Sequence, residues 1–406
     1  MLKVGIDTIS FYTSHYVLDQ TELALARGTD PDKFRIGLGQ HQMAVAAPDE
    51  DIVTLAANAA QQALKDIDLS SIEMLLFATE SGVDQSKSAG IYVHQLLGLP
   101  ERCRVLELKQ ACYSATGALQ LALPFLKSFP DRKILLIASD IARYGLGTTG
   151  ESSQGCGAVA MVLSAHPRIL AIESEYGVVT EDVMDFWRPN YSDQAFVEGK
   201  YSSRLYLSML EKTWHQYFMQ SGRDFRDHQH FCYHTPVPRL VEKAHRVLAK
   251  INHYPDADTE ETVQRSLTYA RQIGNSYTAS LYLALIALLD FSDKDLTNQR
   301  VGFYSYGSGC VAEFFSGVIQ PGYQKVLHKE AHAKILAERV SLSVAEYENF
   351  YSFELPQDGS ECLLPQYTRG AFRLAGIREH KRIYAHVSQH IDYVDFSESV
   401  SVANDA

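Results

Sequence analysis

The sequence predicts an α/β fold made of two similar halves, and two observations carry this prediction. The first is a repeated helical pattern: residues 109–126 read K-Q-A-C-Y-S-A-T-G-A-L-Q-L-A-L-P-F-L, and residues 274–289 read G-N-S-Y-T-A-S-L-Y-L-A-L-I-A-L-L. Each stretch begins with small residues and continues as a run of Leu and Ala, which is typical of a helix buried on nearly all faces inside a large protein. When the two stretches are aligned, Asn275 falls on Cys112.

The second observation is a pair of short strands upstream of these helices. Residues 74–79 lead into Glu80, and residues 229–233 lead into His234. The chain therefore resembles one unit used twice, with Glu80 and Cys112 in the first copy and His234 and Asn275 in the second. If the two buried helices are related by a two-fold axis, their N-termini meet and the four side chains gather at one place.

The other elements fit a sheet that is covered by helices on both faces. Residues 74–78 and 133–139 are unbroken apolar runs, which is typical of strands buried on both faces. We expect strands at 4–11, 103–108, 158–163, 169–174 and 301–305, helices at 18–27, 51–66, 88–97, 205–219, 240–252 and 256–272, and a strand pair within 371–386. We expect loops at 28–39, 145–157 and 185–202, and a glycine turn at 306–309. The halves are predicted to occupy 1–165 and 166–388, with a polar tail at 389–406.

Composition narrows the class of protein. The chain has 406 residues, enough for a large core, and a formal net charge of -12, which argues against general nucleic-acid binding. It has no signal-peptide pattern, and no apolar run approaches the roughly 20 residues of a membrane span. Six cysteines are scattered without a C-x-x-C pair, which favours reduced thiols in a cytoplasmic protein. We find no spacing that is typical of metal ligands.

Cys112 is the candidate nucleophile. We expect its thiol at the first turn of the helix in 109–126, where the positive end of the helix dipole would favour the thiolate. A thiolate is the form that attacks a thioester. A lone cysteine in an apolar run is more often a buried structural residue, so the pattern by itself leaves both interpretations open.

Taken in order, the motifs resemble those of the hydroxymethylglutaryl-CoA (HMG-CoA) synthase family in its bacterial mevalonate-pathway form. They are G-I-D-T-I-S-F-Y, G-L-G-Q-H-Q-M-A-V, A-T-E-S at Glu80, K-Q-A-C-Y-S-A-T at Cys112, S-D-I-A-R-Y-G, D-F-W-R-P, H-T-P at His234, G-N-S-Y-T-A-S-L-Y and F-Y-S-Y-G-S-G. The resemblance runs from Val4 to about Tyr347. It implies a thiolase-like fold with five alternating layers, αβαβα, made of two similar halves.

The resemblance also implies roles for particular residues. Cys112 matches the family's acyl-accepting nucleophile, Glu80 its base for carbon–carbon bond formation, and His234 the residue that holds the acetoacetyl group and polarises its ketone. The other acetoacetyl contacts that it implies are Tyr144, Phe186, Asn275 and Ser308. The backbone N–H groups of Cys112 and Ser308 match the expected oxyanion donors.

Some positions depart from the family pattern, mainly where CoA is expected. A Pro-Thr pair is Ser152-Ser153 here, which keeps a hydroxyl at Ser153, and the CoA-facing lysine falls on Arg239, with Lys243 one turn further on. An acidic protein that binds an acidic ligand needs a local basic patch. The candidates for this patch are Arg27, Lys33, Arg35, Arg239 and Lys243.

Three alternatives stay open. A polyketide β-branching relative shares the catalytic trio but takes substrates from acyl carrier proteins, which would favour a broad basic face rather than a net charge of -12. Ketoacyl-ACP synthase III shares the fold, Cys112, His234 and Asn275 but has no use for Glu80. A silent acyl-CoA binder would show no special reactivity at Cys112. The resemblance further implies a homodimer that acts on CoA thioesters without a separate cofactor. From charge and hydropathy we expect neither a nucleic-acid nor a membrane partner.

Overall fold

A nine-stranded mixed sheet organises the protein. The computed structural model describes residues 2–192, 194–254 and 261–388, so the predicted tail at 389–406 lies outside the described residues. The sheet has the strand order β11-β12-β13-β8-β1-β7-β6-β4-β5. Its strands are β1 (Gly5–Tyr12), β4 (Ile72–Ala78), β5 (Arg104–Leu108), β6 (Lys133–Ala142), β7 (Gly155–Ser164), β8 (Leu170–Thr180), β11 (His230–Tyr233), β12 (Arg300–Gly307) and β13 (Val311–Ile319).

The two halves of this sheet repeat one pairing scheme. In the first half β4 runs parallel to β6, β6 antiparallel to β7, and β7 antiparallel to β1. In the second half β11 runs parallel to β12, β12 antiparallel to β13, and β13 antiparallel to β8. The halves join where Gly5 and Ile6 of β1 pair with Ala171 and Leu170 of β8. Within the described residues, only the first half carries an additional edge strand, β5.

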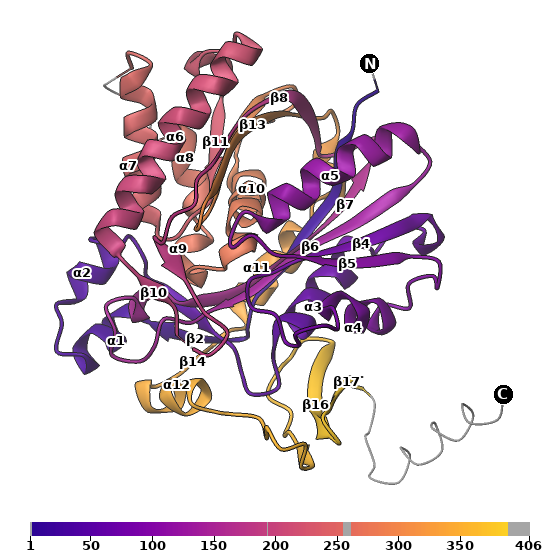
Figure 1. Cartoon of the computed structure of the whole chain (residues 1–406), viewed down its shortest axis with the longest axis vertical. Coiled ribbons are helices and arrows are strands. Elements are labelled where there is room, and N and C mark those ends of the chain that lie inside the picture. The colour runs from indigo at the N-terminus through magenta and orange to yellow at the C-terminus, as the bar shows by residue number, and fades with distance from the viewer. Residues whose placement is uncertain (1, 193, 255–260, 389–406) are drawn as a thin grey trace.

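Helices cover both halves of the sheet and separate them. The principal helices are α3 (Ile52–Ala63), α4 (Ala89–Leu96), α5 (Ser114–Ser128), α6 (Gly199–Ser221), α7 (Pro238–Ile251) and α10 (Ser280–Phe291). α3 packs on β1, β6 and β7, α6 packs on β8 and β13, and α5 and α10 lie between the two halves (Figure 1). The hydroxyls of Thr116 on α5 and Tyr282 on α10 are 2.9 Å apart in this middle layer. The five predicted αβαβα layers are therefore present.

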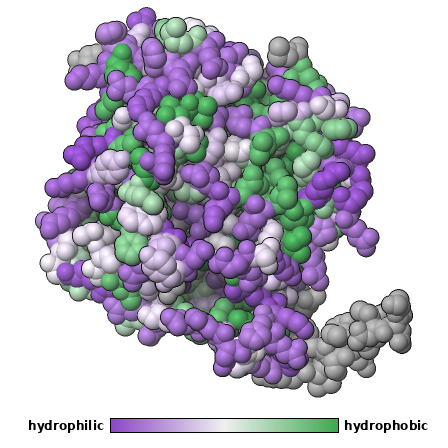
Figure 2. All heavy atoms as spheres, viewed as in Figure 1, coloured by the Kyte–Doolittle hydropathy of each residue, from purple (hydrophilic) through white to green (hydrophobic). Residues whose placement is uncertain are grey.

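The two middle helices differ in their burial. α10 is buried along nearly its whole length, as its sequence predicts. α5 buries Ala115, Ala118 and Leu119, but Leu121 is 68% exposed in the single chain. The prediction that 109–126 is enclosed on nearly all faces is therefore wrong for one face of α5. Figure 2 shows apolar side chains gathered on the side of the molecule that carries α5 and β5.

The smaller elements surround this framework. They are β2 (Tyr16–Asp19), β3 (Gln42–Val45), β9 (Phe186–Trp187), β10 (Phe196–Val197), β14 (Val340–Ser341), β15 (Cys362–Leu363), β16 (Phe372–Arg378), β17 (Lys381–His386), α1 (Gln20–Ala26), α2 (Pro31–Arg35), α8 (Glu261–Gln264), α9 (Ala270–Ile273), α11 (Lys329–Ala337) and α12 (Val344–Tyr351). Single 3-10 turns are η1 (Leu69–Ser71), η2 (Glu151–Ser153), η3 (Phe225–Asp227), η4 (Arg265–Leu267), η5 (Tyr277–Ala279) and η6 (Tyr323–Val326).

Four predicted segments need correction. The predicted loop at 28–39 contains the short helix α2, and the predicted loop at 185–202 contains β9 and β10 and ends where α6 begins at Gly199. The part of 256–272 that the structure describes is a series of short turns with Val263, Leu267 and Tyr269 buried, rather than one exposed charged helix. The predicted loop at 145–157 ends early, because β7 already begins at Gly155. Among the described residues, no helix combines the length and the apolar character that a membrane crossing requires.

Candidate active site

Cys112 and Glu80 form the centre of the candidate site. Glu80 follows the end of β4, and Cys112 follows β5 and precedes α5. The Cys112 thiol donates a hydrogen bond to Oε1 of Glu80 across 2.8 Å. Cys112 is only partly buried, whereas Cys156 and Cys232 are fully buried. The thiol is therefore both paired with a carboxyl and accessible to a small molecule.

The backbone just before Cys112 is strained. Ala111 has a φ of 44°, in the left-handed region that residues with a Cβ seldom adopt. Such a conformation costs about 1 kcal/mol or more, and it persists where the surrounding structure enforces it. Gly274 holds the matching place before Asn275, with a φ of 86°. The aligned positions of the two halves thus both have a positive φ just before Cys112 and Asn275.

Asp140 connects Glu80 to the second half of the chain. It is fully buried, and its Oδ1 accepts hydrogen bonds from the Thr79 hydroxyl at 2.8 Å and the Glu80 backbone N–H at 2.9 Å. Its Oδ2 accepts from the Thr278 hydroxyl and, at 3.1 Å, from the Thr278 backbone N–H. Burial raises the pKa of Asp140, and the hydrogen bonds oppose that shift. One carboxyl therefore fixes the end of β4 against the segment that leads into α10.

The predicted acidification of Cys112 by a helix dipole is wrong. α5 begins at Ser114, so Cys112 lies before the first turn rather than in it. Burial raises the pKa of the Cys112 thiol well above its usual range, and the carboxyls of Glu80, Asp140 and Asp185 raise it further. Burial likewise raises the pKa of Glu80 to about 8, with Asp140 adding to the rise and the hydrogen bond from Cys112 opposing it.

His234 is buried at the end of β11 in a neutral state. Burial lowers the pKa of the His234 imidazole to about 3. Its Nδ1 lies 2.6 Å from Oγ of Ser280, the first residue of α10, and its backbone carbonyl accepts a hydrogen bond from the Tyr206 hydroxyl at 2.7 Å. Since Thr278 binds Asp140 only two residues before Ser280, one short segment holds the supports of both Glu80 and His234.

Aromatic rings form one wall of the site. The Tyr144 ring lies 5.8 Å from that of Phe186 and 5.9 Å from that of Tyr277, and the Asn275 side chain donates a hydrogen bond to the Tyr144 hydroxyl at 3.0 Å. Burial raises the pKa of Tyr144, and the neighbouring Cys112 and Glu80 raise it further. Tyr144, Phe186 and Asn275 are thus brought together, as the sequence predicts.

The turn between β12 and β13 packs against the Cys112 segment. A Cβ at Gly307 would lie 2.6 Å from the backbone nitrogen of Tyr113, so only glycine allows this approach. The Gln110 side chain donates to the Ser308 carbonyl at 3.3 Å. The buried Asp185 accepts hydrogen bonds from the Tyr306 hydroxyl at 2.6 Å and the Gly309 N–H at 2.9 Å, which fixes the turn. Ser308 therefore lies next to the cysteine loop.

The predicted CoA contacts lie at the start of α7. Arg239 and Lys243 occupy the exposed start of α7, where Arg239 pairs with Glu242 at 2.5 Å and donates to the Ile36 carbonyl at 3.0 Å. This contact brings α7 against the residue that follows α2, and α2 itself carries the exposed Lys33 and Arg35. Four of the five predicted basic residues therefore lie on two adjoining elements.

Arg27 has a structural role instead. It donates two hydrogen bonds to the carboxyl of Glu151, at 2.8 and 2.7 Å, and forms an ion pair with Glu348 at 2.7 Å. The buried Glu151 also accepts from the Gly147 N–H at 2.9 Å. The guanidinium of Arg27 therefore anchors the glycine loop, and its place in a basic patch stays a prediction. In that loop the Ser153 hydroxyl donates to the Gly150 carbonyl at 2.8 Å.

Comparison with known proteins identifies the family. A family model described as hydroxymethylglutaryl-coenzyme A synthase N terminal matches residues 2–167, and one described as hydroxymethylglutaryl-coenzyme A synthase C terminal matches residues 256–354. The hydroxymethylglutaryl-CoA synthase of Enterococcus faecalis is 43% identical over 365 residues, which cover 89% of this chain and 95% of that protein. The chain belongs to the HMG-CoA synthase family.

Other members of the HMG-CoA synthase family extend this result. A crystal structure of an HMG-CoA synthase complexed with CoA superposes on this chain with a TM-score of 0.91 and is 42% identical in sequence. The match covers 95% of this chain and 100% of that chain. The polyketide biosynthesis 3-hydroxy-3-methylglutaryl-ACP synthase of Bacillus subtilis is 36% identical over 371 residues, which cover 86% of this chain and 88% of that protein. The thiolase-like fold predicted from the sequence is confirmed, and the protein is an enzyme of the HMG-CoA synthase family.

Several supporting residues of this HMG-CoA synthase were not predicted as site residues. Asp140 accepts a hydrogen bond from Glu80, and Ser280 is hydrogen-bonded to His234. Thr278 supports Asp140 in turn, and Asp185 fixes the turn at Ser308. The sequence does offer a signal for Thr278 and Ser280, because they are hydroxyl residues at the start of an otherwise apolar helix. Burying a hydroxyl there is costly unless it finds a partner.

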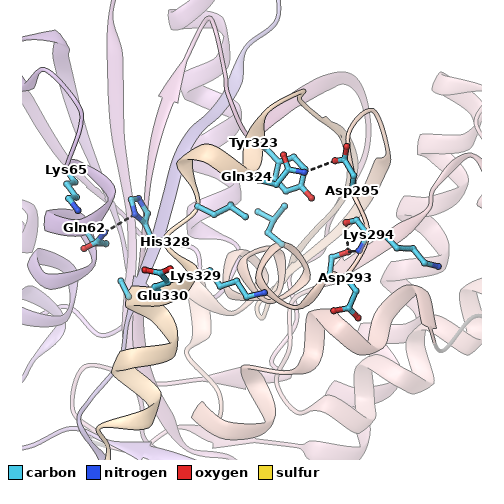
Figure 3. A pocket seen from close by; sticks show the side chains of 14 residues that line it. Gln62, Lys65, Asp293, Lys294, Asp295, Tyr323, Gln324, His328, Lys329 and Glu330 are labelled. Atoms are coloured by element: carbon cyan, nitrogen blue, oxygen red, sulfur yellow. Dashed lines mark hydrogen bonds between the residues drawn. The ribbon is translucent and has the colours of Figure 1, made fainter.

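A separate cavity of about 700 Å³ contains none of the predicted site residues. It lies where the end of α3, the end of α10 and the start of α11 meet, and Figure 3 shows charged side chains of both signs around it, including Lys65, Asp293 and Lys329. Its mixed charge does not indicate any one class of ligand.

Proposed function

We propose that this enzyme condenses acetyl-CoA with acetoacetyl-CoA and water to give 3-hydroxy-3-methylglutaryl-CoA and CoA, through an acetyl-cysteine intermediate in the mevalonate pathway. The observation that carries the proposal is the contact of 2.8 Å between the Cys112 thiol and the Glu80 carboxyl. A nucleophile and a base in one place are what acyl transfer followed by proton abstraction requires.

The first step is acyl transfer to Cys112. The sulfur attacks the carbonyl carbon of acetyl-CoA as the thiol loses its proton, and CoA leaves as a thiol. Because burial and three carboxyls raise the pKa of Cys112, the resting enzyme holds a thiol rather than a thiolate at neutral pH. Backbone N–H groups of Cys112 and Ser308 are the proposed donors to the developing oxyanion.

The second step forms the carbon–carbon bond. Glu80, as carboxylate, removes a proton from the methyl group of the acetyl-cysteine, and the resulting carbanion attacks the ketone carbon of acetoacetyl-CoA. The alkoxide that forms then takes up a proton. A pKa of about 8 makes Glu80 a stronger base than an ordinary carboxylate, which suits the removal of a weakly acidic proton. Water finally hydrolyses the thioester to Cys112 and releases the product.

The remaining residues position acetoacetyl-CoA. His234 is neutral, since its pKa of about 3 lies far below physiological pH, so it acts as a hydrogen-bond donor to the substrate carbonyl rather than as a cation. Tyr144, Phe186 and Asn275 form one wall of the site, and the Ser153 hydroxyl lies on the glycine loop. Arg239 and Lys243 are the proposed contacts to the acidic part of CoA.

A product analysis tests this function. The purified chain is incubated with acetyl-CoA and acetoacetyl-CoA, and HMG-CoA and free CoA are quantified by mass spectrometry. We expect one HMG-CoA per CoA released, and no product from the Cys112→Ala variant. The same assay with acetyl-loaded carrier protein in place of acetyl-CoA is the comparison. Turnover with the carrier substrate only would contradict the proposal and assign the chain to the polyketide branch.

We also propose that the enzyme is a cytoplasmic homodimer. The strand β5 is a sheet edge, and Leu106 on it is 59% exposed, close to the exposed Leu121 face of α5. An unpaired, apolar sheet edge favours pairing with a second copy of the chain. The cytoplasmic location is supported by the six cysteines, which are all free, as is typical of a reducing compartment. Sedimentation should give a dimer mass, and Leu106→Arg should give the monomer; a wild-type monomer would contradict the dimer.

A further inference from the structure

Ser280 makes two hydrogen bonds at the base of the catalytic histidine candidate. Its Oγ lies 2.6 Å from Nδ1 of His234 and accepts a hydrogen bond from the Thr235 backbone N–H at 3.1 Å. Both side chains are almost inaccessible, with 3% exposure each. A buried hydroxyl and a buried imidazole nitrogen must satisfy each other, because water does not reach either group.

The donors and acceptors around Ser280 determine which atom carries the proton between Ser280 and His234. The Thr235 N–H already uses one lone pair of Ser280 Oγ, so the hydroxyl still has its own proton to donate. Within the described residues, the acceptor available to the Ser280 hydroxyl is Nδ1 of His234. If Nδ1 carried the proton instead, Oγ would accept twice and its own proton would be buried without an acceptor. The complete arrangement therefore has an unprotonated Nδ1.

We propose that Ser280 is a positioning residue that holds His234 in the Nε2–H tautomer, so that the ring presents an N–H donor to the carbonyl oxygen of the acetoacetyl substrate. This inference rests on the proposed function. A neutral imidazole carries one proton, so accepting at Nδ1 fixes a donor at Nε2. The opposite tautomer would direct a nitrogen lone pair at a carbonyl oxygen, which repels it.

The fold fixes the backbone of Ser280 and that of His234. It opens α10, whose N-terminal segment is fastened to Asp140 through both the backbone and the side chain of Thr278. The His234 backbone N–H donates to the Tyr304 carbonyl at 2.8 Å. The ring and the hydroxyl are therefore both held by their backbones, and the hydrogen bond sets the tautomer rather than the general location of the ring.

The variant Ser280→Ala tests the role. Without the hydroxyl, His234 can take either tautomer, so condensation should fall by about tenfold to a hundredfold, since one preorganised donor is commonly worth that much or more. Acetylation of Cys112 by acetyl-CoA should stay within about twofold of the wild type, because that step does not use His234. Ser280→Thr, which keeps a hydroxyl, should recover most of the condensation rate.

Ser276→Ala is the matched control. Ser276 is equally buried, lies four residues earlier on the same segment, and its hydroxyl has no hydrogen-bond partner in the described part of the chain. Its replacement should leave both steps near the wild-type rate. An equal loss of acetylation and condensation in Ser280→Ala, or full condensation in that variant, would overturn the proposal.

Neutron diffraction on the wild-type protein provides a measurement that does not depend on a variant's folding. We expect a deuteron on Nε2 of His234 and the Ser280 deuteron directed at Nδ1. A deuteron on Nδ1 alone would overturn the role of Ser280. This result is independent of turnover, so a wild-type chain that forms no HMG-CoA contradicts the proposed function and leaves the tautomer to be decided by the diffraction.

Discussion

The Sγ atom of Cys112 and the Oε1 atom of Glu80 lie 2.8 Å apart, yet they affect each other in opposite directions. The carboxyl raises the pKa of the thiol, both by its charge and by accepting the hydrogen bond. The thiol, by donating that hydrogen bond, lowers the pKa of the carboxyl, which burial has raised. The pair therefore favours a protonated sulfur beside an ionisable carboxyl, which is the arrangement that a separate nucleophile and base require.

The first prediction separates the two chemical steps. Glu80→Ala should still form acetyl-Cys112, because removing the carboxyl lowers the pKa of the thiol. It should lose condensation by about 10²- to 10⁴-fold, which is the usual contribution of a positioned general base. Single-turnover acetylation and steady-state product formation measure the two steps. A variant that does not acetylate would contradict the separate roles.

The second prediction concerns the pH dependence of thiol alkylation. Because the pKa of Cys112 is raised, the rate of its modification by iodoacetamide should keep rising with pH beyond 9 in the wild type. In Glu80→Gln the like charge is gone, so the pKa falls and the rate at pH 7.5 should be several-fold higher. Peptide mapping identifies Cys112, and the buried Cys156 and Cys232 serve as slow internal references. A plateau below pH 8 in the wild type would oppose this account.

The third prediction addresses the ion pair that anchors the glycine loop. Arg27→Ala leaves the carboxyl of Glu151 buried without its main partner, so the free energy of unfolding should fall by about 1–3 kcal/mol. Adding Glu151→Gln should restore part of the loss, since the unpaired charge disappears. Arg35→Ala replaces an exposed arginine and should change the free energy of unfolding by less than about 0.5 kcal/mol. Urea unfolding measures the stability of all three variants. Equal effects of Arg27→Ala and Arg35→Ala would refute the anchoring role of Arg27.

The fourth prediction tests the proposed CoA contact. Arg239→Ala should raise KM for both CoA substrates by about three- to tenfold while kcat changes little, as expected when uniform binding is lost. Arg246→Ala is the control, because Arg246 lies on the same exposed face of α7 and lies 3.9 Å from the same Glu242. An unchanged KM in Arg239→Ala would remove this residue from the CoA site.

The sequence predicted what depends on local pattern and on duplication. The repeated helices α5 and α10, the strands that lead into Glu80 and His234, and the hairpin at Ser308 all follow from apolar runs with polar ends. Those features suffice for the fold and for the proximity of Cys112 to Glu80. The common scheme of the two half-sheets then follows from the repeat.

What the sequence did not predict depends on contacts between distant segments. The raised pKa of Cys112 reflects burial and three carboxyls from separate segments of the chain. The partner of Arg27, Glu151, lies 124 residues further along the chain. The exposure of Leu121 on α5 was not predicted, because an apolar residue that lies on an open face looks the same in the sequence as one in the core. Ser280 reads as an ordinary helix-start serine until His234 is placed 2.6 Å away.

The most direct test of the central claim is the intact mass of the protein after mixing with acetyl-CoA alone, followed by peptide mapping. The account predicts a gain of one acetyl group on Cys112, which disappears on addition of acetoacetyl-CoA as HMG-CoA forms. An acetyl group on a different residue, or no acetyl gain by a folded protein, would contradict Cys112 as the nucleophile.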